Sequence, residues 1–355
     1  MRNLRLLVTG FGTALVLVAC SSAQSGPLLA TPTTSTTPIP PPPPPPHYNS
    51  FSGRLAPDGE VLAVKIDDTE AAHPQIGLEE ADVVYVEQVE GGLTRLAAIF
   101  SSKIPTRIGP VRSARISDID LLGQYGKVAF AYSGAQRKML PIIAAANLFN
   151  LGAQRESAVF YPRDFARVAP VNLILKARQI LSQAPGAVRA HNVGWTFGAA
   201  PLAGKPLISV TVVWPMSRYR AVWSTDEKRW LLEHDRSPDL AASGVHLGPS
   251  TLVIQQVQIH PSQFGDKRGN NTPKSETIGT GVGWILRDGN SYAATWSRAG
   301  LADGTHWKSS DGTEIRFAPG PIWVFLSDSS RNPKFERPTP VVTAPAVTPT
   351  PSVSK

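Results

Sequence analysis

The chain has 355 residues, a formal net charge of +8 and a single cysteine. One cysteine excludes a disulfide framework and cysteine-based zinc fingers. The charge is dispersed and forms no Lys/Arg run, so we expect no nucleic-acid partner. A hydrophobic fraction of 42% beside 33 prolines and 29 glycines predicts a globular body joined to proline-rich segments.

The first 20 residues predict a lipoprotein signal peptide. Arg2 and Arg5 precede an apolar run over residues 6–19, which is too short to anchor the chain as a membrane-spanning helix. The run ends in Leu-Val-Ala-Cys (17–20), which resembles the bacterial lipobox and implies a lipid on Cys20. Two acyl chains anchor a protein stably where one does not. We expect an extracytoplasmic protein attached to the bacterial cell membrane through Cys20, with an ordinary secretory leader as the alternative.

Low-complexity sequence flanks the body on both sides. Residues 21–50 are rich in Pro and Thr and include seven consecutive prolines, which favour an extended polyproline II spacer. Recognition by a proline-binding partner is the alternative. A second proline-rich segment, residues 332–355, predicts a disordered tail.

The sequence between the low-complexity segments predicts an α+β protein, with a mixed α/β domain over residues 51–190 followed by a β-rich domain over residues 205–328. In the first domain, apolar runs predict strands at 61–67, 82–89, 94–101 and 127–133, and helical periodicity predicts helices at 116–125, 136–147 and 172–182. In the second, turn residues separate short strands at 208–214, 219–224, 229–234, 251–260, 277–286, 291–297 and 322–326.

The second and third strands predict a hairpin that carries charged residues. If Gly91 and Gly92 form a two-residue turn, Glu90 pairs with Leu93 and Glu87 pairs with Leu96. Glu90 and Arg95 are then diagonal neighbours on one face of the hairpin. Glu87 points to the other face, into apolar surroundings, where a carboxylate needs a donor or has a perturbed pKa.

An arginine-rich segment precedes the helix predicted at 116–125. Gly109 and Pro110 predict a turn that places Arg112, Ser113 and Arg115 at the start of that helix. Backbone N–H groups and guanidinium forks there favour a carboxylate or phosphate ligand. Internal pairing with Glu87, Asp118 or Asp82 is the alternative.

Three further polar residues belong to the candidate ligand set, namely Arg163, Asp164 and Asn172. Asp164 and Asn172 each precede an apolar stretch, so helix capping is the alternative for both. The seven histidines show no close metal-ligand spacing, and the chain has no Gly-x-Ser-x-Gly motif. We therefore predict neither a dedicated metal site nor a cofactor.

The order of motifs over residues 52–328 resembles the YerB-like bacterial lipoproteins. The motifs are Val-Lys-Ile-Asp (64–67), Pro-Gln-Ile-Gly-Leu-Glu-Glu-Ala-Asp-Val-Val-Tyr (74–85), Glu-Gly-Gly-Leu-Thr-Arg (90–95), Gly-Pro-Val-Arg-Ser-Ala-Arg (109–115), Tyr-Pro-Arg-Asp (161–164) and Ala-Pro-Val-Asn (169–172). The family is defined by domains of unknown function. The resemblance therefore implies a fold and an extracytoplasmic address but no established reaction.

Two functions follow from these residues. The first is a membrane-tethered accessory module that binds an anionic or carboxylate-bearing envelope component, such as a cell-wall peptide, through a groove built by Glu87, Glu90, Arg95, Arg112, Ser113 and Arg115. The second is a peptidoglycan hydrolase or transglycosylase in which Glu87 is the general acid and Asp67 or Asp164 the second carboxylate. The sequence does not decide whether the protein is an enzyme.

Overall fold

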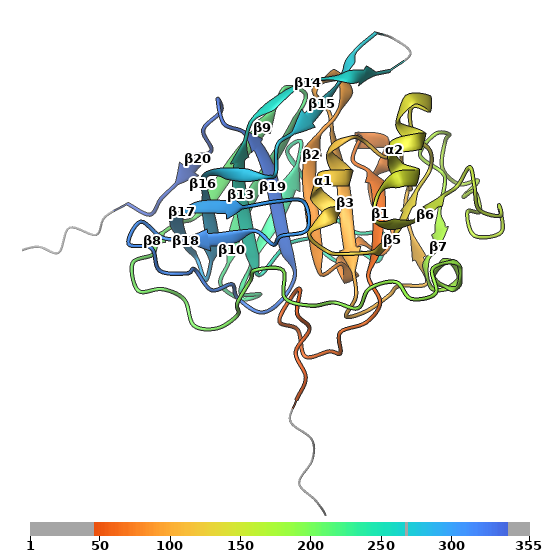
Figure 1. The fold of residues 1–355 in the computed structure, drawn as a ribbon. Coiled ribbons are helices and arrows are strands. Elements are labelled where there is room, and N and C mark those ends of the chain that lie inside the picture. The colour runs from red at the N-terminus through yellow and green to blue at the C-terminus, as the bar shows by residue number, and fades with distance from the viewer. Residues whose placement is uncertain (1–45, 267–268, 340–355) are drawn as a thin grey trace, which may run out of the picture. The chain divides into compact units, whose positions relative to one another are not determined.

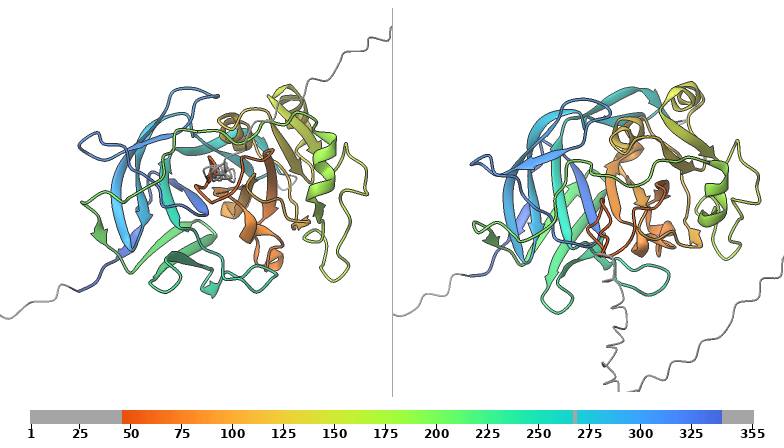
Figure 2. Two further views of the ribbon diagram at one scale, coloured as in Figure 1. Left: turned by 90° about the horizontal axis from the view of Figure 1, so that it is seen from below. Right: turned by 60° about the horizontal axis from the view of Figure 1, so that its bottom comes forward.

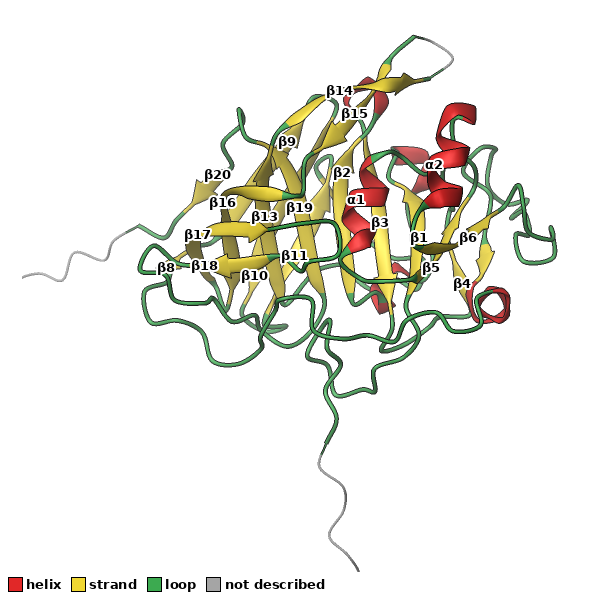
Figure 3. Ribbon diagram, in the orientation of Figure 1, coloured by secondary structure: helices red, strands yellow, loops and turns green. Residues whose placement is uncertain are grey.

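The computed structural model describes residues 46–266 and 269–339. The predicted signal peptide, Cys20 and most of the two proline-rich segments lie outside these residues. The described part is rich in strands, with three short α-helices (Figure 3). None of its helices combines the length and the apolar character needed to cross a membrane.

One large mixed sheet runs through both predicted regions (Figure 1). From one edge to the other its strands are β18 (His306–Lys308), β17 (Asn290–Arg298), β16 (Gly279–Arg287), β13 (Thr251–Val257), β19 (Ile322–Asp328), β2 (Val83–Gln88), β3 (Thr94–Phe100), β1 (Leu62–Asp67), β5 (Val128–Tyr132) and β6 (Leu148–Gly152), with β8 (Lys205–Pro206) beside β17. β19 lies parallel to both β13 and β2 and so joins the two regions by backbone hydrogen bonds.

A second sheet covers one face of the large sheet. Its strands are β12 (Ser237–Pro238), β11 (Arg229–His234), β10 (Ser217–Ser224), β9 (Ser209–Trp214) and β20 (Lys334–Glu336). Apolar residues alternate along β9 to β11, as a strand with one buried face requires. Trp214 packs edge-on against Phe325 of β19 and donates a hydrogen bond to the Leu326 carbonyl at 2.9 Å.

Helices α1 (Ser117–Gly123) and α2 (Leu140–Ala145) lie on the opposite face of the large sheet (Figure 2). The third helix, α3 (Ala177–Ile180), contributes its buried residues to the core on the face that the second sheet covers. Buried residues of α1 and α2 join a core that also contains Tyr85 and Phe130 from the strands. Two small ribbons complete the fold: β4 (Arg107–Ile108) with β7 (Leu175–Lys176), and β14 (Ile259–Gly265) with β15 (Asn271–Ser275).

The structure differs from the predicted elements in three places. The first region is β-rich rather than clearly mixed α/β, because its helices are short: residues 136–147 contain only η4 (Arg137–Met139) and α2, and residues 172–182 contain β7, α3 and η5 (Leu181–Gln183). Within the predicted tail, residues 334–336 form β20, which pairs with β9. Asn49, placed in the predicted linker, is buried.

The β2–β3 hairpin has a different register from the one predicted. Three residues, η3 (Glu90–Gly92), make its turn, and Gly91 and Gly92 both have positive φ. Glu87 therefore pairs with Arg95, not with Leu96. A slip of one residue moves every side chain of a strand to the other face. Glu87 and Arg95 consequently lie on the same face of the sheet, with Asp67 of β1 directly beyond Arg95.

Candidate functional site

A cavity of about 800 Å³ opens at the edge of the sheet where β1 and β2 end. The carboxyl ends of parallel strands are a common place for ligand sites in sheets of this kind. Its lining combines the end of β1, the β2–β3 hairpin, the segment before α1, η4 and the β14–β15 ribbon. We call it the arginine cavity; its charged lining residues are Asp67, Glu90, Arg95, Arg112, Arg115, Arg137 and Asp266. Five predicted ligand residues meet there: Glu90, Arg95, Arg112, Ser113 and Arg115.

Two of the three predicted arginines are paired with acids of the chain. The Arg112 Nε atom lies 2.5 Å from an Asp67 carboxylate oxygen. Arg115 holds Glu90 through Nε at 2.8 Å and Nη2 at 2.6 Å, and Glu90 also accepts a hydrogen bond from Thr272 of β15. These pairs form the cavity wall and fix the β14–β15 ribbon to the hairpin.

In the part of the chain that the structure describes, Arg95 has no acidic partner. Among the described residues its guanidinium makes one hydrogen bond, from Nη1 to the Ser113 carbonyl at 3.1 Å, and no ion pair. Burial, together with the guanidiniums of Arg115 and Arg112, lowers the pKa of Arg95 to about 9. The side chain is therefore still a cation at neutral pH. Its remaining donors make Arg95 the cavity residue best suited to bind an anion.

The start of α1 does not offer the free anion site that the sequence suggested. An oxygen of Asp118 accepts the Arg115 backbone N–H at 2.6 Å. The protein's own carboxylate therefore occupies the position that a ligand anion would take. Anion binding at this cavity depends on side chains, not on the helix terminus.

Glu87 does not reach the cavity. It is fully buried and forms an ion pair with Lys65 of β1, whose Nζ atom also lies 2.8 Å from Asp118. Burial lowers the pKa of Lys65 to about 8, against the attraction of Asp118. The buried triad of Lys65, Glu87 and Asp118 thus joins the sheet to α1. This enclosure leaves Glu87 without the access to substrate that a general acid requires.

Arg163, Asp164 and Asn172 form a separate group that does not line the cavity. Arg163 donates to the Asn172 side chain at 2.7 Å, and the Asp164 backbone N–H donates to the Asn172 carbonyl at 2.7 Å. Asp164 also accepts the Ala166 N–H at 3.1 Å and lies 3.5 Å from Arg107. These contacts hold a surface loop, and neither Asp164 nor Asn172 caps an α-helix.

Other cavity residues were absent from the sequence-based set. Arg137 lines the cavity, and its side chain makes no hydrogen bond or ion pair among the described residues. Gln136 and Thr272 add polar groups, and Val89, Leu93 and Met139 add apolar surface. The basic character of residues 94–138 was the available signal for Arg137, whereas only the fold brings Thr272 of the second region to this place.

Comparison with known proteins gives a consistent family. The model described as "Protein of unknown function (DUF3048) N-terminal domain" matches residues 52–190, and the corresponding C-terminal domain model matches residues 210–324. A Bacillus subtilis (strain 168) protein named "Putative lipoprotein YerB" is 35% identical over 108 residues, which are 30% of this chain and 32% of that protein. The matched segment thus spans about a third of the length of this relative.

A solved structure has the same fold. The crystal structure of the YerB protein from Bacillus subtilis superposes with a TM-score of 0.69 at 19% sequence identity. The similarity covers 82% of this chain and 100% of the other. Both family models, their order along the chain and the shared fold lead to one conclusion: the chain belongs to the DUF3048 family of proteins of unknown function and is related to YerB.

Proposed function

We propose that this protein is a lipid-anchored, extracytoplasmic module that binds an anionic ligand in the arginine cavity. The observation that carries the proposal is Arg95, a largely buried cation in the cavity wall that has no carboxylate partner within residues 46–266 and 269–339. A buried charge is costly unless it is paired, so an anion that enters the cavity gains a partner that folding leaves available. Arg137 supplies a second cation at the same cavity.

The chemistry of the lining favours a carboxylate on a partly apolar ligand. One guanidinium fork matches one carboxylate in a bidentate contact. Val89, Leu93 and Met139 would contact the apolar part of the ligand. Peptides of the cell wall carry such carboxylates and are present in the compartment expected from the lipobox-like sequence at Cys20.

Binding of soluble muropeptides tests the proposal. We expect saturable binding by calorimetry for muropeptides with free carboxylates, and about 10–100-fold weaker binding to Arg95→Met, since a hydrogen bond to a charged group is worth about 1.5–3 kcal/mol. Arg155→Met, which removes an exposed arginine outside the cavity, is the matched control and should bind as the wild type does. Equal affinity for amidated muropeptides, or for Arg95→Met, would count against the proposal.

The anchor is tested separately. Supporting it are the lipobox-like sequence and the name of the Bacillus subtilis relative. Metabolic labelling with a palmitate analogue should label the wild type and leave Cys20→Ser unlabelled, and the Cys20→Ser protein should leave the membrane fraction. Label retained in Cys20→Ser would place the lipid elsewhere and contradict this part of the proposal.

No observation favours the hydrolase alternative. The residue proposed as general acid, Glu87, is enclosed with Lys65 and Asp118. Two acids of the cavity wall, Asp67 and Glu90, are engaged by arginines. The arrangement supports recognition of a ligand better than proton transfer to it.

A further inference from the structure

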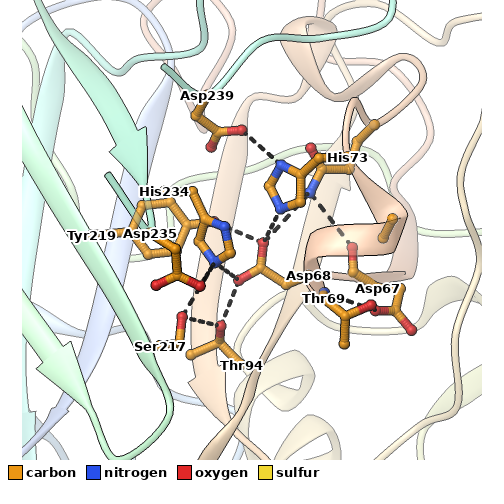
Figure 4. A network of polar contacts seen from close by, with 12 residues as sticks. Asp67, Asp68, Thr69, His73, Thr94, Ser217, Tyr219, His234, Asp235 and Asp239 are labelled. Carbon is orange, nitrogen blue, oxygen red and sulfur yellow. Dashed lines mark hydrogen bonds and ion pairs between the residues drawn. The ribbon is translucent and has the colours of Figure 1, made fainter. Parts of the chain in front are cut away.

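A cluster of histidines and aspartates lies on the other face of the large sheet, between β1 and the second sheet (Figure 4). Asp68 follows β1, His73 follows η1 (Glu70–Ala72), and His234 ends β11. One ligand atom from each of these three residues lies within 4.8 Å of the others. We call this group the histidine cluster. His234 lies far from Asp68 and His73 in sequence, so residue spacing gave no indication of the complete cluster.

Both imidazoles approach the same carboxylate from different sides. His73 Nε2 lies 3.4 Å from Asp68 Oδ1, and His234 Nε2 lies 3.7 Å from Asp68 Oδ2. Both separations exceed the usual length of a charge-assisted hydrogen bond, about 2.7–2.9 Å. Ligand bonds of about 2.0–2.2 Å in a tetrahedral zinc site place neighbouring ligand atoms about 3.4 Å apart. The separations in the cluster therefore suit an ion between the ligands better than a direct contact.

Neighbouring groups orient the ligand atoms of His73. Asp239 lies 3.1 Å from His73 Nδ1, so this nitrogen carries the proton and donates it to the carboxylate. The Gln75 side-chain nitrogen, which is also near Asp68 Oδ1, lies 3.2 Å from His73 Nε2. With the proton on Nδ1, Nε2 carries the lone pair that a metal ligand needs, and an ion bound there would take the place of the Gln75 contact. A histidine that donates its other N–H to a carboxylate is the common arrangement around protein-bound metals.

The Asp68 carboxylate is buried, but its hydrogen bonds leave an acceptor position that an ion could occupy. Tyr219 donates to Oδ1 at 2.7 Å and Thr94 donates to Oδ2 at 2.6 Å. A carboxylate has about four acceptor positions; Oδ1 also accepts from Gln75 at 3.4 Å, whereas Oδ2 keeps one position that could bind an ion. Asp239 is also buried, which makes the cluster rich in negative charge for its depth. A cation is required to balance two buried carboxylates.

We propose that the histidine cluster binds a divalent transition-metal ion, with Zn²⁺ as the reference, through His73 Nε2, His234 Nε2 and an Asp68 oxygen. Imidazole and carboxylate are the ligands that Zn²⁺ shares with neighbouring first-row metals. Ser217, whose hydroxyl lies 3.2 Å from His234 Nε2, is placed to supply the fourth ligand. Asp239 is a positioning residue for His73.

A proton on His73 is the competing occupant. Burial alone would lower the pKa of His73, but its contacts with Asp239 and Asp68 raise it to about 10. Either a protonated His73 or a bound metal ion would balance the negative charge of Asp68 and Asp239. A metal-binding measurement distinguishes these two states.

The test uses the purified full-length protein after treatment with a chelator. At pH 7.5 we expect one equivalent of ZnCl₂ to bind by calorimetry, and CoCl₂ to give the visible absorption of a four-coordinate site. His73→Gln and His234→Gln should each lose at least about 100-fold in affinity, and Asp239→Asn about 10–100-fold. His260→Gln, which removes an exposed histidine paired with Glu276, should leave affinity unchanged.

Each outcome decides between the two occupants. No saturable binding to the wild type shows that the cluster holds a proton only and overturns the proposal. Zinc binding that survives in both His73→Gln and His234→Gln, or that is lost in His260→Gln, places the ion elsewhere and also overturns it. Because the wild-type titration is decisive by itself, the proposal stays testable even if a cluster variant does not fold. Failure of anion binding at Arg95 has no bearing on this result.

Discussion

Lys65 is a lysine with no exposed surface, and it is held between Glu87 and Asp118. Removing one member of a buried ion network leaves the other charges without partners, which costs about 3–5 kcal/mol. We therefore expect Lys65→Met to lower the free energy of unfolding by about this amount, measured by urea denaturation. Adding Glu87→Gln to Lys65→Met should restore part of the lost unfolding free energy, because it removes one buried carboxylate that has no cationic partner. A loss below about 0.5 kcal/mol would contradict the buried network.

Glu90 provides a prediction about pH. Burial alone would raise the pKa of Glu90, but pairing with Arg115 and the Thr272 hydroxyl lower it below its ordinary value of 4.5. A carboxylate whose pKa is lower in the folded state stabilises the protein above its unfolded pKa, and this stabilisation is lost as the pH falls. The difference in unfolding free energy between wild type and Glu90→Gln should be largest near pH 7 and should shrink below about pH 4.5. A difference that is constant from pH 7 to pH 3 would be evidence against the pair.

At the residue scale, the sequence predicted which residues line the cavity better than it predicted the ion pairs between them. The concentration of bases after residue 94 pointed to Arg95, Arg112 and Arg115, and all three line the arginine cavity. The partners of Arg112 and Arg115 were not predictable, because Asp67 and Glu90 reach these two arginines only through the register of three strands. The histidine cluster was missed for the same reason: His73 lies in the loop after η1, and His234 ends β11 of the second sheet.

At the scale of elements, strands were predicted more accurately than helices. The runs at 61–67, 94–101 and 127–133 correspond to β1, β3 and β5 within one residue at each end. Tertiary packing sustains a buried strand, whereas an isolated helix of one or two turns is marginal and its length is poorly encoded. The predicted length of the hairpin turn was wrong. Two adjacent glycines suggested a two-residue turn, but a three-residue turn uses the same glycines at positive φ.

The two hairpin glycines offer a matched pair of substitutions. Both have positive φ, but a Cβ at Gly91 meets nothing within 4 Å, whereas one at Gly92 would lie 2.5 Å from the Pro215 Cβ atom. Gly91→Ala should therefore cost only the backbone strain, about 1 kcal/mol. Gly92→Ala should cost clearly more, because it also displaces the β9–β10 turn, where the Met216 N–H donates to the Gly92 carbonyl at 2.9 Å. Equal losses in urea denaturation would contradict this contact.

At the scale of the whole molecule, the large sheet makes the two family regions one folding unit. β19 lies between β13 of the second region and β2 of the first. A chain that ends after Ala190 leaves the β2 edge unpaired and its apolar residues exposed, and such an edge promotes aggregation. We expect this fragment to be insoluble or to lack a cooperative transition by circular dichroism, with the full-length chain as the control. A soluble fragment that unfolds cooperatively would show that the first region is independent.

The late position of β19 has a consequence for biogenesis. The strand that completes the large sheet ends at residue 328 of 355. Nearly the whole polypeptide must therefore be synthesised before its central hydrogen-bonded ladder can close. Until β19 is made, the facing edges of β13 and β2 have no strand between them.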